Sequence, residues 1–148
     1  MLHEHGRDAF HRVWDAVERV LTRTKEQIEK NMKFMMMMIP RVYQPNTPAA
    51  EKAGEGFAPP ADAVERMMKF NEELTKAGAL IALDGLHPAA RGARVAFSSG
   101  KAKVTDGPFI ESKEVVGGYW IIQAKSKEEA VEWARRCPAA DGDMIEIR

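Results

Sequence analysis

The residues with the clearest chemical potential lie around an Asp-Gly-Pro turn. Asp106 opens this turn, and His87 stands earlier in the chain, directly before Pro88. A carboxylate beside an imidazole orients it and stabilises its charged form, which is the arrangement of a general acid/base pair. We therefore take His87 and Asp106 as candidate catalytic residues. A structural role stays open for both, because such an aspartate also bonds the amides of its own turn and a lone histidine is often a surface residue.

Charged and aromatic residues on either side of the turn are candidates for binding a substrate. A lysine in a loop folded over a pocket can hold a carboxylate or enolate oxygen, and a glutamate there can move a proton. The alternative is a solvated loop, with Gly117 and Gly118 serving only a close approach of two chain segments. The candidate substrate-binding residues are Arg94, Glu111, Lys113, Glu114 and Tyr119.

Neither a cofactor nor a metal is expected. The chain has no phosphate-cradling glycine loop ending in Gly-Lys-Ser/Thr and no Gly-x-Ser-x-Gly elbow. The histidines near the N-terminus are not accompanied by a cysteine or carboxylate set with the spacing of a structural zinc site. The four consecutive methionines at 35–38 would point alternately to opposite faces of a strand, so their thioethers cannot converge on copper. We interpret them as core residues.

Composition excludes several classes of function. The 148 residues are enough for one domain with a core of its own. Lys and Arg together number 22, as do Asp and Glu, so no overall field attracts nucleic acid or an anionic membrane. The longest apolar run is far shorter than a membrane span, the N-terminus lacks the apolar core of a signal peptide, and the lone Cys137 excludes an internal disulfide framework. We expect a cytoplasmic protein without a nucleic-acid or membrane partner.

An amphipathic helix is expected over residues 8–31. Its inward residues alternate steps of four and three, which is the spacing of a heptad seam. They are Phe10, Trp14, Val17, Leu21, Thr24 and Ile28. Such a helix cannot bury its stripe alone, so it must pack on the body of the protein or on a partner chain. We assign residues 1–31 to an N-terminal helical extension and residues 32–148 to the main domain.

The main domain alternates strands and helices. The apolar run at 34–39 predicts a central strand buried on both faces. The long loop at 40–60 is typical of a binding loop or a disordered segment, with Tyr43, Gln44 and Phe57 as its candidate contact residues. The further elements expected are a helix from the capping-box pattern Asp62-x-x-Glu65 to Gly78, a strand at 79–86, a hairpin at 94–97 and 101–105, a strand at 117–124, a helix from the capping box Ser126-x-x-Glu129, and a strand at 144–148.

The order of these elements is the split βαβ plan of the ferredoxin-like α+β fold. In this plan two helices cover one face of the antiparallel sheet, and the other face stays uncovered. An exposed apolar face of that size requires a partner, so we expect a homodimer.

Several short motifs occur in the order of a known family. They are Leu86-His87-Pro88, Gly92–Val95, Val104–Phe109, Glu111-x-Lys113-Glu114, Gly117–Trp120, Ser126-x-x-Glu129-Ala130 and Ile145–Arg148. Through these motifs residues 32–148 resemble the DGPF branch of the YCII-related family. The resemblance implies a ferredoxin-like domain that dimerises into an α+β barrel, and a His-Asp pair as the active centre. It also implies a functional link to extracytoplasmic-function sigma factors, whose genes often accompany those of the family.

The resemblance is incomplete at one position. The histidine proposed for the wider family lies in its first helix, where this chain has glutamates and Asn71 but no histidine. His87 and Asp106 therefore carry over only from the pattern of the DGPF branch. One relative is a dehydrochlorinase of a chlorinated aromatic diol or quinol. We expect a small dimeric ligand-binding or regulatory protein, and the alternative is a cofactor-free lyase or isomerase, dehydrochlorinase-like, that acts on a small aromatic or carboxylated substrate.

Overall fold

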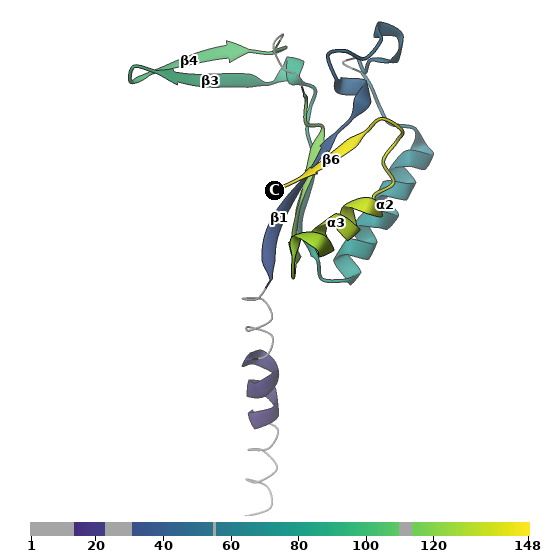
Figure 1. Ribbon diagram of the computed structural model, residues 1–148, viewed down its shortest axis with the longest axis vertical. Helices are drawn as coiled ribbons and strands as arrows, with labels where there is room; N and C mark the ends of the chain where they lie inside the picture. Colours follow the sequence, from purple (N-terminus) through teal and green to yellow (C-terminus); the bar gives the residue numbers. More distant parts are fainter. Residues whose placement is uncertain (1–13, 23–30, 55, 110–113) are drawn as a thin grey trace, which may run out of the picture. The chain divides into compact units, whose positions relative to one another are not determined.

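The computed structural model describes residues 14–22, 31–54, 56–109 and 114–148 (Figure 1). The chain divides into two compact units, Met1–Met32 and Lys33–Arg148. In the first unit residues 14–22 are helical, and the apolar side chains exposed on them are Trp14, Val17, Val20 and Leu21. The expected helix is thus present at 14–22, and the rest of that prediction lies outside the described residues. The assignment of residues 1–31 to a separate extension stays a prediction.

Four strands form one sheet. They are β1 (Met32–Ile39), β2 (Leu80–Gly85), β5 (Gly118–Ala124) and β6 (Met144–Ile147), in the order β2-β5-β1-β6. β1 pairs antiparallel with β6, and β2 pairs antiparallel with β5. The N–H of Gly117, just before β5, donates to the carbonyl of Met38 near the end of β1 at 2.8 Å. β5 therefore begins where β1 ends and runs antiparallel to it.

Two helices lie on one face of this sheet (Figure 1). α2 (Ala61–Lys76) follows β1 in the chain, and α3 (Lys127–Arg135) follows β5. The strand order and the placement of the helices confirm the expected ferredoxin-like α+β fold. No helix among the described residues is long and apolar enough to cross a lipid bilayer.

The core lies between the sheet and the helices. The rings of Phe70 and Trp120 meet edge-on, with their centroids 6.0 Å apart. The indole N–H of the buried Trp120 donates to Asn71 Oδ1 at 2.8 Å, so this polar atom has a partner. The buried hydrophobic residues of the cluster are Met36, Met38, Phe70, Leu74, Ala79, Trp120, Ile122, Ala124 and Ala130.

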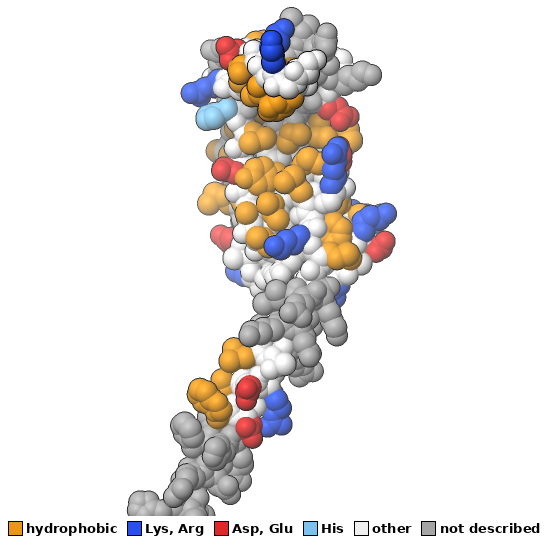
Figure 2. Space-filling view, turned by 90° about the vertical axis from the view of Figure 1, so that its left-hand side faces the viewer, with side chains coloured by type: hydrophobic (Ala, Val, Ile, Leu, Met, Phe, Trp, Pro, Cys, Tyr) orange, Lys and Arg blue, Asp and Glu red, His pale blue; other side chains and the backbone are white. Residues whose placement is uncertain are grey.

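The opposite face of the sheet is uncovered in the described part of this chain. Side chains alternate along β1, so Met36 is fully buried whereas Met35 is 38% exposed. The strand predicted to be buried on both faces is therefore covered on one face over most of its length, and Ile39 at its end, which pairs with Met144 on the other face, is 3% exposed. We call the uncovered surface the open face, and the register of the strands assigns to it Met35, Met37, Ala82, Tyr119, Ile121 and Met144. Figure 2 shows the hydrophobic side chains gathered over this face.

The start of α2 differs from the predicted capping box. Pro60 is the N-cap and makes no side-chain cap bond. Asp62 lies inside the first turn, where its carboxylate accepts a hydrogen bond from Arg66 at 2.6 Å. This bond and the charge of Arg66 lower the pKa of Asp62. The prediction of a cap at Asp62 is wrong, because the helix begins at Ala61 and the ion pair one turn along engages the carboxylate.

The other predicted helix signals are confirmed. Ser126 Oγ accepts from the N–H of Glu129 at 3.2 Å, and the Glu129 carboxylate accepts from the N–H of Lys125 at 2.6 Å. These two bonds satisfy amides at the start of α3. Gly78 follows the end of α2 with φ 67°, a left-handed conformation that glycine adopts without strain.

The expected hairpin forms a separate two-stranded sheet. β3 (Ala93–Ser98) pairs antiparallel with β4 (Lys101–Asp106). Ser99 and Gly100 connect the strands with φ 49° and φ 73°, the left-handed pair that a two-residue hairpin turn of this type requires. The hairpin extends from the end of the main sheet toward the side opposite the helices (Figure 1).

Candidate functional site

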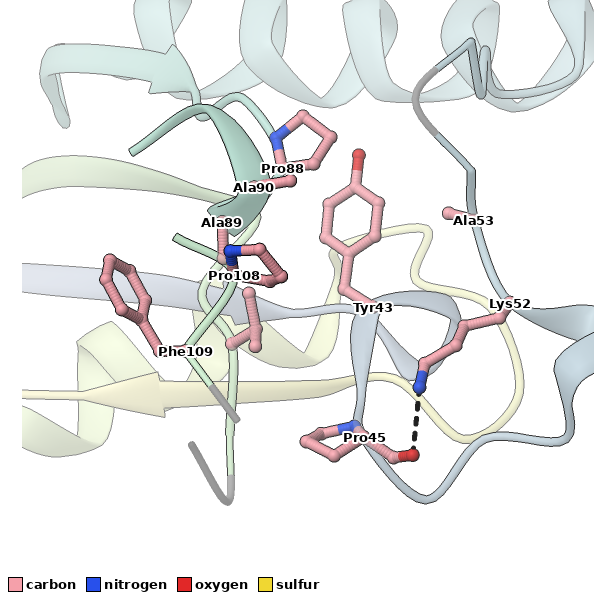
Figure 3. Close-up of a pocket in the computed structure, with 10 residues that line it drawn as sticks. Tyr43, Pro45, Lys52, Ala53, Pro88, Ala89, Ala90, Pro108 and Phe109 are labelled. Atoms are coloured by element: carbon pink, nitrogen blue, oxygen red, sulfur yellow. Dashed lines mark hydrogen bonds between the residues drawn. The ribbon is translucent and has the colours of Figure 1, made fainter. Parts of the chain in front are cut away.

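A cavity of about 420 Å³ lies between four segments of the chain (Figure 3). The first segment is the long loop after β1, the second is the short helix η3 (Ala89–Arg91), the third follows β4, and the fourth precedes β5. The lining residues are Tyr43, Pro45, Lys52, Ala53, Pro88, Ala89, Ala90, Pro108, Phe109 and Val115. Proline, alanine, valine and phenylalanine dominate the walls, so the cavity is largely apolar.

The long loop after β1 is folded on itself. Thr47 is buried, and its hydroxyl donates to the carbonyl of Arg41. The N–H of Ala53 donates to the carbonyl of Val42 at 2.9 Å, and the guanidinium of Arg41 lies 2.5 Å from the Glu51 carboxylate. These contacts bring the two parts of the loop that line the cavity into one compact structure. The described residues of this loop thus form one wall of the cavity, and ligand binding by the loop stays a prediction.

The Asp-Gly-Pro turn forms a second wall through backbone contact with η3. The N–H of Gly107 donates to the carbonyl of Gly92 at 2.8 Å. A Cβ atom at Gly107 would lie 1.8 Å from the carbonyl oxygen of Ala89, so only glycine fits. The following peptide, Gly107–Pro108, is cis. The glycine of the motif thus holds Pro108 and Phe109 beside η3, where both line the cavity.

Gln44 attaches the segment before β5, which forms the remaining wall, to the loop after β1. Its amide oxygen accepts from the N–H of Val115 at 2.9 Å, and its amide nitrogen donates to the carbonyls of Val115 at 3.1 Å and of Pro40 at 2.6 Å. A Cβ atom at Gly117 would lie 2.5 Å from Pro40 Cγ. The structural interpretation of Gly117, a close approach of two segments, is therefore confirmed. Together these contacts hold Val115 beside Tyr43.

Two polar side chains reach the cavity among the described residues that line it. The ring of Tyr43 stands between Pro88 on one side and Ala53 on the other (Figure 3), and it meets the ring of Phe57 edge-on at 6.1 Å. Lys52 is exposed, and its Nζ donates to the carbonyl of Pro45 at 2.9 Å. An apolar cavity with one phenol and one ammonium suits a small apolar molecule that carries an acceptor or anionic oxygen.

The two candidate catalytic residues are sequence neighbours of residues in two walls of the cavity. His87 directly precedes Pro88, and Asp106 directly precedes Gly107. Both side chains are exposed, and within the described residues no hydrogen bond joins them. The structure therefore does not bring them into a bonded pair. Their role in acid/base chemistry stays a prediction.

Arg94 contacts the lining residue Phe109 and does not itself line the cavity. Its guanidinium carbon is 4.1 Å from the centroid of the Phe109 ring, which is the geometry of a cation–π contact. The side chain thus supports a lining residue from the base of the hairpin. Tyr119 is half-buried on the open face, where the register pairs it with Asp84.

The charged run after the turn is described only in part. Glu114 is exposed and directly precedes the lining residue Val115. Glu111 and Lys113 lie outside the described residues. Substrate binding by these residues stays a prediction.

Lys52 was missed by the sequence reasoning. A lysine in a loop rich in proline and alanine carries no spacing that marks it as a cavity residue. The length of the loop was the available signal, and it indicated Tyr43 and Gln44. Tyr43 lines the cavity, and Gln44 hydrogen-bonds the lining residue Val115.

Two further groups bear on the chemistry. Cys137 is half-buried, and desolvation, with the Asp143 carboxylate adding to it, raises the pKa of the thiol to about 11. The thiol therefore stays protonated at neutral pH and is poorly suited to act as a nucleophile. Over the ranges that the structure describes, no cluster of three or more His, Cys, Asp or Glu residues could hold a metal ion.

Comparisons with known proteins identify the family. A family model described as the YCII-related domain matches residues 32–148. An uncharacterized protein of Rhizobium meliloti (strain 1021) is 35% identical over 75 residues, which are 48% of this chain and 60% of the relative. The match thus spans less than two thirds of that curated relative. The chain belongs to the YCII-related family.

Proposed function

We propose that this protein is a small homodimeric ligand-binding protein of the YCII-related family whose site is the cavity at Tyr43 and Lys52. The observation that carries this proposal is the cavity itself. Its volume of about 420 Å³ lies in the range of small-molecule sites, and its walls are apolar with few polar groups. That composition is typical of a site that buries an apolar body and fixes it by one or two polar contacts.

The polar groups define the class of ligand. The ammonium of Lys52 has three donors, and the carbonyl of Pro45 uses one of them, so two remain for an anionic oxygen. The hydroxyl of Tyr43 offers a further donor. Phe109 and the prolines suit a flat or compact apolar body. We therefore infer a small aromatic or aliphatic molecule with one carboxylate or phenolate oxygen.

The open face supports the homodimer. Met35 is 38% exposed and Met144 is 50% exposed, and both lie on a face that no helix covers in the described part of the chain. Apolar surface of this kind marks an interface. A second copy seated on the open face buries the same surface on both molecules by two-fold symmetry.

Three finer attributes accompany this proposal. Residues 106–109 read Asp-Gly-Pro-Phe, which supports the DGPF branch of the family. We further propose a cytoplasmic location and a functional link to a sigma factor. The location rests on the composition of the chain and its lone cysteine, and the link to a sigma factor rests on the resemblance alone.

A second candidate function is catalytic. His87 directly precedes the lining residue Pro88, and Asp106 stands two residues before the lining residue Pro108. A lyase or isomerase of the dehydrochlorinase type would need the two side chains within hydrogen-bond reach of one another or of the substrate. Binding is the better supported function, because it needs no rearrangement of the described structure.

Thermal unfolding with a panel of small aromatic carboxylates and their neutral amides tests the binding proposal. A ligand at a hundred times its Kd stabilises the native state by about 2.7 kcal/mol, which is readily seen as a rise in Tm. We expect carboxylates to raise the Tm of the wild type and of the control Lys127→Gln, and to lose most of that effect in Lys52→Gln. The amides should bind both lysine variants alike. Equal carboxylate shifts in wild type and Lys52→Gln would refute the site.

Turnover of the compounds that bind separates the two functions. Each binding compound is incubated with wild type, His87→Gln and Asp106→Asn, and the mixture is followed by chromatography. Product formed by the wild type and lost in both variants would establish the catalytic alternative. Binding without product in any sample supports the binding protein.

A further inference from the structure

The hairpin β3–β4, which we call the arm, packs its strands against no other element in the described structure. Every residue of its two strands is exposed. Phe97 is 79% exposed, Val104 is 64% exposed and Val95 is 52% exposed, so its large apolar side chains meet water. A single two-stranded hairpin is only marginally stable in water. An arm of this composition requires a surface to pack on.

The register divides the arm into two unlike faces. Val95 pairs with Val104 and Phe97 pairs with Ala102, and because partners and alternate residues share a face, these four form an apolar face. The opposite face carries Arg94, Lys101 and Lys103. This charged face is suited to contact with water. The apolar face is therefore the one that we expect to be buried against another surface.

The direction of the arm indicates where that cover lies. The arm projects to the side of the sheet opposite the helices, which is the side of the open face (Figure 1). In Figure 2 it points at the viewer above the hydrophobic patch of the open face, and its own hydrophobic side chains gather toward that patch. A molecule seated on the open face would therefore lie along the apolar face of the arm.

The length of the arm suits a second copy of this chain. Each strand has six residues, which at about 3.3 Å per residue span about 20 Å. Two sheets that pack face to face lie about 10 Å apart, so the arm reaches past the sheet of a molecule seated on the open face to the level of its helices. A short peptide on the open face would leave the outer half of the arm uncovered.

We propose that the arm of each protomer packs its apolar face, formed by Val95, Phe97, Ala102 and Val104, onto the body of a second copy of this chain. The contact is reciprocal by two-fold symmetry, so each dimer contains two arm contacts. The inference rests on the dimer proposed above and adds a second, separate contact region to it. In this dimer the partner contacts both the open face and the apolar face of the arm.

Sedimentation equilibrium of three variants tests the arm and the open face separately. Phe97→Ser removes the largest apolar side chain of the arm, Lys103→Ser alters its opposite face, and Ile121→Glu places a charge on the open face. Each dimer buries two copies of Phe97, so we expect Phe97→Ser to raise the dimer Kd roughly 100-fold. Lys103→Ser should change the Kd less than about threefold, and Ile121→Glu should give a monomer.

Hydrogen exchange supplies a second readout that does not depend on the variants. The amides of the hairpin should exchange at least about tenfold faster in wild type diluted to the monomer than in the dimer. Dimerisation lost in Ile121→Glu but unchanged in Phe97→Ser, with equal exchange of the hairpin in both states, overturns the arm and leaves the open-face dimer intact. A wild type that stays monomeric at high concentration overturns both. Slow exchange of the hairpin already in the monomer would show that it packs on its own chain, which also overturns the proposal.

Discussion

Replacing Gln44 by alanine should loosen the wall of the cavity at a defined place. The side-chain amide makes three hydrogen bonds, two to the backbone of Val115 and one to the carbonyl of Pro40. No other described residue bonds the N–H of Val115. The substitution therefore detaches the segment before β5 from the loop after β1, while it leaves the sheet and the core unchanged.

The expected loss follows from these bonds. A neutral hydrogen bond contributes about 0.5–1.5 kcal/mol net to stability. The three bonds are half-buried, so water can partly replace them in the variant, and we expect the free energy of unfolding to fall by about 2 kcal/mol. For a domain of this size that corresponds to a fall in Tm of about 7 °C. The amide of Val115 should exchange about 30-fold faster, because each 1.4 kcal/mol is a factor of ten.

Urea unfolding and hydrogen exchange measured on the same samples check both numbers. Gln123→Ala is the matched control, because Gln123 makes a single exposed bond to the carbonyl of Gly78 at 2.7 Å. It should cost about 0.5 kcal/mol and leave the exchange of Val115 unchanged. Gln44→Glu separates the bonds further: its carboxylate still accepts from the N–H of Val115 but cannot donate to the two carbonyls.

The outcome for Val115 decides the reasoning. If Gln44→Ala leaves both the unfolding free energy and the Val115 exchange rate at their wild-type values, the wall is not held by this side chain. If stability falls but Val115 exchanges as before, the three bonds contribute to global folding and not to the local attachment inferred above.

Three further predictions concern the scaffold. Ser126→Ala removes the acceptor for the N–H of Glu129 and should lower the unfolding free energy by about 1 kcal/mol in urea titrations. Gly117→Ala forces a Cβ to within 2.5 Å of Pro40 Cγ and should cost about 2 kcal/mol, whereas Gly54→Ala, with nothing within 4 Å, should be neutral in the same assay. Burial raises the pKa of Cys137 from 9.0 to about 11, so its contribution to stability is complete below pH 9 and is lost as the pH rises from 9 to 11. Iodoacetamide should therefore alkylate native Cys137 about 100-fold more slowly than unfolded protein at pH 8, and equal rates would contradict the burial of this thiol.

The elements of the fold were predictable because their signals are local. The apolar run at 34–39, the turn residues at 98–100 and the capping box at Ser126 each occupy a few consecutive residues, and the structure contains all three elements. Asp62 shows the limit of such signals. Its spacing to Glu65 fits a capping box, but Arg66 lies one helical turn away and engages the carboxylate instead.

The candidate site was predictable only in outline. The Asp-Gly-Pro turn and the long loop both led to segments that line the cavity. The contacts between those segments join residues far apart in the sequence, as Gln44 and Val115 do, and no local pattern encodes them. The pairing of His87 and Asp106 has the same limit. Their types suit a dyad, but their meeting depends on packing between segments far apart in the sequence, so the pair stays a prediction.

The methionine run of β1 and the arm support assembly by the same physical reasoning. An antiparallel strand with one solvated face alternates apolar and polar residues, but 34–39 is apolar throughout. The helices account for Met36 and Met38, which are buried, and nothing in the described chain accounts for Met35 and Met37. The apolar face of the arm is likewise exposed on the same side of the sheet. One second copy seated on the open face covers both apolar surfaces, whereas two different partners would have to bind side by side to do so.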